Sequence, residues 1–294
     1  MRLARLGTQG HEIPVVVTED GYLDLSEIVD DIDHRVLSPD GLDRIRESIG
    51  SLPVLENAAS LRIGAPIARP GAIICIGMNY AAHAAESGST PPERPIIFLK
   101  TPNTIGGPYD SVDIPRASSK TDWEVELGVV IGQRALYLDS PYDAASHIAG
   151  YVTANDLSER EFQLEHSGGQ WSKGKCSPGF SPLGPWLVTS DEIDSTDLRL
   201  RSWVNGEPRQ DSTTADLIFP VDHLVWSLSQ YLALEPGDVI LTGTPAGVAV
   251  SGRFPYLQAG DVVEVEIDGL GRQRQVFGRR SDASMPHRRE RVTT

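Results

Sequence analysis

The sequence predicts an α+β fold in which β-structure dominates. Short apolar runs alternate with turns from the start of the chain, as in residues 12–17 and 21–25, and this pattern is typical of strands. The dipeptides Asn205-Gly206 and Asp268-Gly269 each connect two strand-like runs and are hairpin signals. Helical patterns are fewer, and the longest covers residues 221–232. We therefore expect a chain that is mostly sheet with a few helices.

Charge and composition exclude several classes of protein. The formal net charge is −15 and the isoelectric point is near 4.8, so few phosphates could be neutralised and no nucleic-acid partner is expected. No run approaches the roughly 18 apolar residues that span a bilayer, and the first residues lack the apolar segment of a signal peptide. Cys75 and Cys176 lie far apart, which predicts no disulfide framework. These features predict a soluble, cytoplasmic protein without a membrane partner.

Turn-rich sequence divides the chain into three predicted parts. Residues 1–68 form a small β-rich N-terminal domain with one helix, residues 38–49, that begins at a Ser-Pro pair and ends at a glycine. Residues 70–278 form the main domain. Residues 279–294 are rich in arginine and lack apolar periodicity, which predicts a disordered tail.

Two acids interrupt the apolar run 123–132, which is otherwise typical of a buried strand. Glu124 and Glu126 are two residues apart, so in a strand they project from the same face. Burying ionised carboxylates is costly unless a cation meets them, and a divalent metal ion is the simplest such partner. The alternative is an edge strand whose acidic face is solvated. A third acid, Asp156, follows the predicted strand 151–155 and could converge with the other two as an oxygen ligand.

A histidine and a second glutamate lie on one face of a predicted helix. His83 and Glu86 are three residues apart in the alanine-rich stretch 81–86, which follows the apolar strand 72–77. A carboxylate beside an imidazole raises its basicity, as needed to activate a water molecule. An incidental surface pair is the alternative. Likewise, Lys175 lies in a Gly- and Pro-rich loop from which it could reach a substrate carboxylate, or it could be a plain surface lysine.

The remaining segments complete the predicted secondary structure. Residues 96–100 and 237–241 are predicted strands, and residues 141–149 and 158–166 are predicted helices. Glu264 and Glu266 repeat the alternating acids of the run 123–132 within the predicted strand 261–267. There we expect only a solvated strand face.

Several motifs in a fixed order resemble the fumarylacetoacetate hydrolase family, over about residues 70–278. They are Gly77-Met78-Asn79-Tyr80 with His83 and Glu86, residues 95–100, residues 122–127, Asn155-Asp156, Gln170-Trp171 with Gly174-Lys175, residues 182–185 and residues 237–245. The resemblance implies a mixed β-sandwich roll with peripheral helices, and a homodimer. One departure is that many relatives have Ser-Ala-Arg-Asp where this chain has Ser158-Glu159-Arg160-Glu161.

The resemblance also implies roles for individual residues. Glu124, Glu126 and Asp156 match metal ligands for Mg²⁺ or Mn²⁺, with Ca²⁺ as a further option. His83 and Glu86 match a water-activating pair, Lys175 matches a lysine that faces the substrate, and Gln163 and Thr244 match substrate-binding positions.

The implied reaction is metal-dependent hydrolysis of a carbon–carbon bond in a small anionic 2,4-dioxo acid, such as an acylpyruvate or a fumarylacetoacetate-like compound. It would pass through a metal-bound enolate. An oxaloacetate-type decarboxylase and a 2-hydroxy-dienoate isomerase would use the same site, and the chain could also be a non-catalytic 2-oxo-acid binder. The water-activating pair favours hydrolysis.

Overall fold

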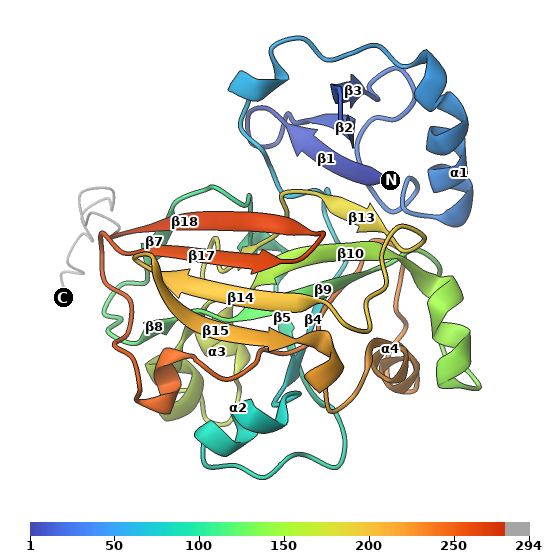
Figure 1. Ribbon diagram of the computed structural model, residues 1–294. Coiled ribbons are helices and arrows are strands. Elements are labelled where there is room, and N and C mark those ends of the chain that lie inside the picture. Colours follow the sequence, from blue (N-terminus) through green and yellow to red (C-terminus); the bar gives the residue numbers. More distant parts are fainter. Residues whose placement is uncertain (280–294) are drawn as a thin grey trace, which may run out of the picture.

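The computed structural model describes residues 1–279, which are organised around two large β-sheets (Figure 1). The larger sheet has nine strands, which are, in spatial order, β3 (Gly21–Asp24), β2 (Ile13–Thr18), β1 (Arg2–Leu6), β13 (Leu187–Thr189), β10 (Ile148–Asn155), β9 (Val125–Ile131), β16 (Val239–Leu241), β4 (Ile73–Gly77) and β5 (Ile96–Lys100). Most neighbouring strands are antiparallel, but β16 and β4 are parallel. The sheet is therefore mixed.

The smaller sheet has five strands, which are β15 (Glu207–Thr213), β14 (Arg199–Val204), β17 (Val262–Ile267), β18 (Gly271–Arg279) and β7 (Val112–Ile114). Two short pairs complete the described β-structure, β8 (Thr121–Asp122) with β11 (Ser158–Glu159) and β6 (Ile105–Gly106) with β12 (Ser181–Pro182). The chain is thus mostly β, as predicted.

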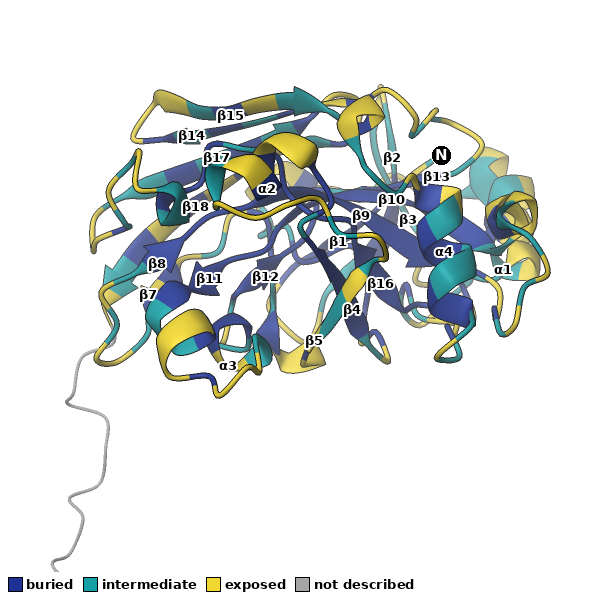
Figure 2. Ribbon diagram, turned by 90° about the horizontal axis from the view of Figure 1, so that it is seen from below, coloured by how far each residue is buried: buried dark blue, intermediate teal, exposed yellow. Residues whose placement is uncertain are grey.

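Helices lie around the sheets (Figures 1 and 2). The α-helices are α1 (Pro39–Ser48), α2 (Ala81–Glu86), α3 (Ser172–Lys175) and α4 (Val221–Ser229). The 3₁₀ segments are η1 (Ile49–Ser51), η2 (Ala58–Ser60), η3 (Pro102–Thr104), η4 (Pro141–His147), η6 (Thr214–Asp216) and η7 (Ala249–Ser251), and η5 (Glu161–Glu165) is a π-helical turn. No helix in the described part of the chain has both the length and the apolar character needed to cross a membrane.

The main core fills the space between the two sheets. Leu127 and Val129 of β9 belong to the same buried cluster as Leu200 of β14 and Val265 of β17. On the other face of the larger sheet, Val130 packs in a second cluster that includes residues of α1. Fully burying one such aliphatic side chain is worth about 2 kcal/mol. Because both of its faces are covered, β9 has no solvated side.

The run 123–132 is therefore a central strand, as its apolar character predicted. The strand itself begins at Val125, so Glu124 lies just before it. The solvated edge strand considered as the alternative is wrong, because β9 is hydrogen-bonded to β10 on one side and to β16 on the other.

The predicted helices at 38–49 and 221–232 are confirmed as α1 and α4, with α4 ending earlier, at Ser229. The prediction of a helix over 158–166 is wrong in its first part. Ser158 and Glu159 instead form β11 against β8, and the Glu159 carboxylate accepts hydrogen bonds from Ser118 Oγ and from the backbone N–H groups of Lys120 and Phe162. Only the π-helical turn η5 remains.

The predicted helix over 141–149 is shorter and of the 3₁₀ type. Ser140 and Asp143 form a capping box at its start, and η4 then ends at His147 because Ile148 is already the first residue of β10.

The N-terminal strands extend the larger sheet at one end (Figure 1). β1 pairs with β13, and Leu3 shares a buried cluster with Cys75 of β4. The division into a 1–68 domain and a 70–278 domain stays a prediction. At the other end of the chain, Arg279 is the last residue of β18 and pairs with Ile114, so the predicted tail 279–294 begins at least one residue later. The rest of that tail lies outside the described residues.

Candidate functional site

Three carboxylates meet where β9 and β10 lie side by side. The register pairs Asn155 with Val125, so the next residue, Asp156, comes opposite Glu124, and the Asp156 N–H donates to the Glu124 carbonyl at 2.9 Å. Glu126 is on β9 itself. One carboxylate oxygen from each acid lies within 4.8 Å of the others, and the three residues are only 5%, 2% and 0% exposed. The predicted convergence of Glu124, Glu126 and Asp156 is therefore present.

Three buried cations surround these acids. Lys175, on α3, donates from Nζ to Glu124 Oε2 at 2.6 Å and to Asp156 Oδ2 at 2.7 Å. Arg160 donates from Nη2 to Glu124 at 2.6 Å and from Nε to Asp122 at 2.8 Å. Lys100, at the end of β5, donates to Asp156 Oδ1 and to two backbone carbonyl oxygens. Lys175 is thus a buried partner of the acids and not a surface lysine.

The neighbouring cations do not balance the negative charges of the three acids equally. Burial alone would raise the pKa of Glu124, but the charges of Lys175 and Arg160 outweigh it and hold that pKa far below its usual range. Burial, together with the carboxylates of Asp156 and Glu124, raises the pKa of Glu126 well above its usual value. Among the described residues, Glu126 has one hydrogen bond, from the Gly243 N–H at 2.8 Å, and no ion pair.

These observations fit a divalent cation. Three carboxylates of the kind that hold Mg²⁺ and Mn²⁺ lie together, and one of them lacks a positive partner that a metal ion would supply. Glu124, Glu126 and Asp156 are the residues that could hold it. Gly243 supports this arrangement because its φ of +99° favours glycine and a Cβ there would lie 2.8 Å from the Cβ of Asn79.

The predicted pair His83 and Glu86 forms on α2. His83 Nδ1 and Glu86 Oε1 are 3.0 Å apart, and the Glu86 carboxylate also accepts a hydrogen bond from the Gly247 N–H at 3.1 Å. Although much of α2 is exposed (Figure 2), His83 is buried on its inner face. The alternative of an incidental surface pair is therefore wrong. Within residues 1–279 the hydrogen bond of His83 is made by Nδ1, which leaves Nε2 for water or substrate.

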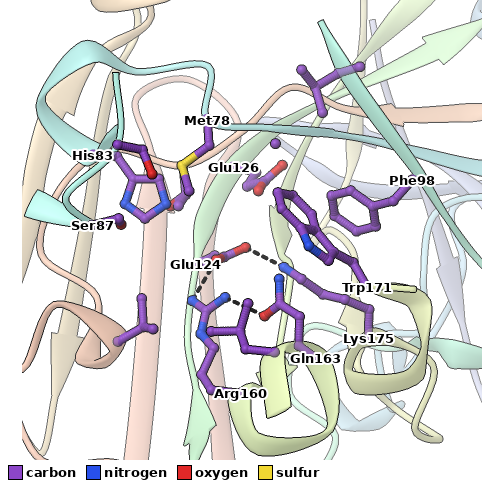
Figure 3. A pocket seen from close by; sticks show the side chains of 16 residues that line it. Met78, His83, Ser87, Phe98, Glu124, Glu126, Arg160, Gln163, Trp171 and Lys175 are labelled. Atoms are coloured by element: carbon purple, nitrogen blue, oxygen red, sulfur yellow. Dashed lines mark hydrogen bonds and ion pairs between the residues drawn. The ribbon is translucent and has the colours of Figure 1, made fainter. Parts of the chain in front are cut away.

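A cavity of about 320 Å³ brings His83, Glu124, Glu126, Arg160 and Lys175 together (Figure 3), whereas Glu86, Asp156 and Lys100 are not part of its lining. Its lining is Ile76, Gly77, Met78, His83, Ser87, Ser89, Phe98, Glu124, Glu126, Arg160, Gln163, Leu164, Trp171, Lys175, Thr244 and Val250. In Figure 3, Met78, His83 and Ser87 lie on one side of the acids, and Phe98 and Trp171 lie on the other. Met78 has a φ of +57°, an uncommon backbone conformation for a non-glycine residue.

The two predicted substrate-binding residues also line this cavity. Gln163 Oε1 accepts a hydrogen bond from Arg160 Nη1 at 2.8 Å, so its amide orientation is fixed. The Thr244 hydroxyl donates to the Val125 carbonyl at 2.9 Å and accepts from Gln210 Nε2 at 2.7 Å. Since its proton is already used, that hydroxyl has only acceptor capacity left for a ligand.

Sequence reasoning missed two members of the site. Lys100 ends an apolar edge strand whose other residues are exposed or partly exposed, so the local pattern does not indicate that the lysine alone is buried. Arg160 lies between two glutamates shortly after Asp156, and nothing in that local pattern indicates that it turns inward.

A family model described as "Fumarylacetoacetate (FAA) hydrolase C-terminal" matches residues 72–277. A protein of Burkholderia multivorans named a "putative hydrolase" is 47% identical over an alignment of 282 positions, and the match covers 94% of this chain and 98% of that protein. This relative's name states no substrate.

Solved structures with the same fold include three whose names state a function. Fumarylacetoacetate hydrolase from Exiguobacterium antarcticum is 32% identical with a TM-score of 0.82, covering 95% of this chain and all of that one. 5-Carboxymethyl-2-hydroxymuconate delta-isomerase from Mycobacterium smegmatis is 34% identical with a TM-score of 0.76, covering 96% and 100%. Maleylpyruvate hydrolase from Sphingobium sp. SYK-6, in complex with manganese(II) and pyruvate, is 27% identical with a TM-score of 0.78, covering 95% and 100%.

Proposed function

Because the chain belongs to the fumarylacetoacetate hydrolase family, we propose that it is a divalent-metal-dependent hydrolase that cleaves a carbon–carbon bond of a 2,4-dioxo acid such as an acylpyruvate. The observation that carries the proposal is that His83, which is held by Glu86, lines the same small cavity as the buried acids Glu124 and Glu126. A base that can activate water, placed beside a site for a 2-oxo acid, favours hydrolysis over the other reactions of the family.

The proposed reaction converts an acylpyruvate and water into a carboxylic acid and pyruvate. The water oxygen bonds to the C4 carbonyl carbon, and the bond between C3 and C4 then breaks. Its electron pair passes to C3, which forms the enolate of pyruvate and takes up a proton. The water supplies one oxygen of the new carboxylic acid, and the other comes from the C4 carbonyl. One water proton passes to C3 and the second stays with the new acid, so atoms and charge balance.

A divalent ion held by Glu124, Glu126 and Asp156 would withdraw electron density from the oxygens of the 2-oxo acid. His83 would take the water proton on Nε2, and Glu86 would stabilise the resulting imidazolium through Nδ1. Lys175 would hold negative charge on the substrate.

Two other reactions remain alternatives on the same residues. An isomerase of a related dienoate is among the similar structures, and a decarboxylase would also stabilise an enolate. Neither reaction requires a base that activates water, so the His83–Glu86 pair speaks for hydrolysis. The homodimer and the cytoplasmic location stay predictions.

The test follows the ultraviolet absorbance of acetylpyruvate and of oxaloacetate, with and without Mn²⁺, for the wild type and for His83→Ala. We expect acetylpyruvate to be consumed only with metal, and the variant to be at least about a hundredfold slower. Mn²⁺ binding, measured by calorimetry, should stay unchanged in the variant. Consumption of oxaloacetate by both proteins would instead indicate a decarboxylase. Binding of pyruvate without turnover of any candidate would indicate a binder.

A further inference from the structure

We propose that the substrate of this site carries an uncharged, apolar group at the end remote from its carboxylate. This inference rests on the proposed function and narrows its substrate class. The structural basis is that the two permanently charged cations of the cavity wall, Arg160 and Lys175, are already paired with buried carboxylates, while six other lining residues are apolar.

Two of the basic groups of the cavity lie close to its acids. Arg160 and Lys175 lie beside Glu124 and Gln163 in Figure 3. Both cations already pair with carboxylates, Arg160 with Asp122 and Glu124 and Lys175 with Glu124 and Asp156. Their positive charge is therefore concentrated where the 2-oxo acid end of the substrate would bind.

No other residue that lines the cavity is a lysine or an arginine. Apart from Arg160 and Lys175, the only basic residue among the 16 lining residues is His83, whose Nδ1 is held by Glu86. The other walls are formed by Ile76, Met78, Phe98, Leu164, Trp171 and Val250. Ser87 and Ser89 add neutral hydroxyls, and Ser87 Oγ is buried without a hydrogen-bond partner in the described structure.

This lining discriminates between two kinds of substrate tail. A second carboxylate packed against these apolar side chains would lose its hydration without gaining an ion pair, because both cations already have carboxylate partners, and this is strongly unfavourable. An alkyl or aryl tail would instead gain about fourfold in affinity for each methylene that it buries. The site is thus built for neutral acylpyruvates and against dicarboxylic 2,4-dioxo acids.

The test compares two ligands that have the same carbon chain and differ only at the far end. 2-Oxohexanoate ends in a methyl group, and 2-oxoadipate ends in a second carboxylate. Full-length protein is first titrated with Mn²⁺ and then with each acid by calorimetry, with pyruvate as the reference without a tail. We expect 2-oxohexanoate to bind at least about tenfold more tightly than either 2-oxoadipate or pyruvate. Equal or tighter binding of 2-oxoadipate overturns the inference, and so does a failure of 2-oxohexanoate to exceed pyruvate.

A matched pair of variants tests the physical cause. Leu164 lines the cavity but is 53% exposed, so a charged side chain there can be accommodated. In Leu164→Arg the preference for 2-oxohexanoate should shrink at least about tenfold or reverse, because the arginine supplies the missing cation. Leu164→Gln, which adds polarity without charge, should keep the preference within about threefold. A similar loss of preference in both variants contradicts the electrostatic cause.

The two proposals fail in distinguishable ways. The binding comparison needs no turnover, so an inactive protein that still prefers 2-oxohexanoate refutes the hydrolase and keeps the inference. Hydrolysis of fumarylpyruvate at least as fast as that of a neutral acylpyruvate would refute the inference and keep the hydrolase. If Mn²⁺ does not bind, the metal-dependent function fails, and the same ligand ratio is measured on the metal-free protein.

Discussion

Two strands of this protein carry the same alternation of acids in opposite environments. Glu124 and Glu126 stand at the start of β9, and Glu264 and Glu266 stand on β17. The first pair is buried within the larger sheet. The side chains of the second pair are 22% and 27% exposed on the smaller sheet. An identical local pattern therefore produces a candidate metal site in one strand and a solvated face in the other, as predicted for β17.

The partners of the acids explain the difference. Glu264 pairs with Arg272 at 3.0 Å, and Glu266 pairs with Arg201 at 3.1 Å, so each outer acid has a cation on a neighbouring strand. Glu126 has none among the described residues, and Asp156 brings a further negative charge close to it. The candidate metal site therefore differs from β17 in having buried negative charge that no cation balances. The spacing of the acids is the same in both strands.

The largest expected contrast concerns metal binding. Glu126→Gln removes one of the three proposed anionic ligands, so we expect the dissociation constant for Mn²⁺ to rise at least about a hundredfold, since even indirect partners of a metal ligand account for 10- to 100-fold. Calorimetry measures this constant, and acylpyruvate turnover should fall with it. Glu264→Gln, the matched change on β17, should leave both quantities unchanged. If Glu126→Gln binds Mn²⁺ as tightly as the wild type does, Glu126 is not a metal ligand.

A second contrast is the effect of pH on the metal-free protein. The raised pKa of Glu126 means that the folded protein keeps a proton that the unfolded chain, with a glutamate pKa near 4.5, has released. Stability must then fall as the pH rises above about 4.5 toward the folded pKa. The lowered pKa of Glu124 acts in the opposite sense, but only below about 4.5.

We therefore expect the melting temperature of the wild type, relative to that of Glu126→Gln, to fall between pH 5 and pH 8, because the unfolded chain releases the Glu126 proton at lower pH than the folded protein does. Scanning calorimetry without metal measures it. Glu264→Gln should follow the wild type. Parallel curves for the wild type and Glu126→Gln would show that Glu126 does not hold a proton in the folded state.

The smallest expected effect is at the outer pair. Arg272→Met removes the ion pair with Glu264 and the contact of the guanidinium with the Trp203 ring, 4.3 Å from its centroid. Exposed pairs of this kind contribute about 1 kcal/mol or less, so the free energy of unfolding in urea should fall by no more than that. Mn²⁺ affinity should not change. If the free energy of unfolding falls by more than about 2 kcal/mol, the strand face that carries Glu264 and Glu266 contributes to stability and is not simply solvated.

Much of the candidate site could be predicted because its residues lie on short, regular segments. A period of two placed Glu124 and Glu126 on one side, and a spacing of three placed His83 beside Glu86. The prediction of a helix over 158–166 failed in its first part because Glu159 accepts hydrogen bonds from Ser118 and Lys120, which lie about 40 residues earlier in the chain. Local propensity carries no information about such partners.

The sequence by itself determined the residue types, the local periodicities and the order of motifs that identify the family. Only the tertiary structure decided that β9 is covered on both faces, that Lys100 and Arg160 are partners of the acids, and that apolar side chains from several elements line the same cavity as those acids. The physical reason is that desolvation and Coulomb interactions depend on distance in space and on burial. Lys100 lies 56 positions before Asp156 in the sequence. A local sequence pattern cannot show that two residues so far apart are in contact in the folded protein.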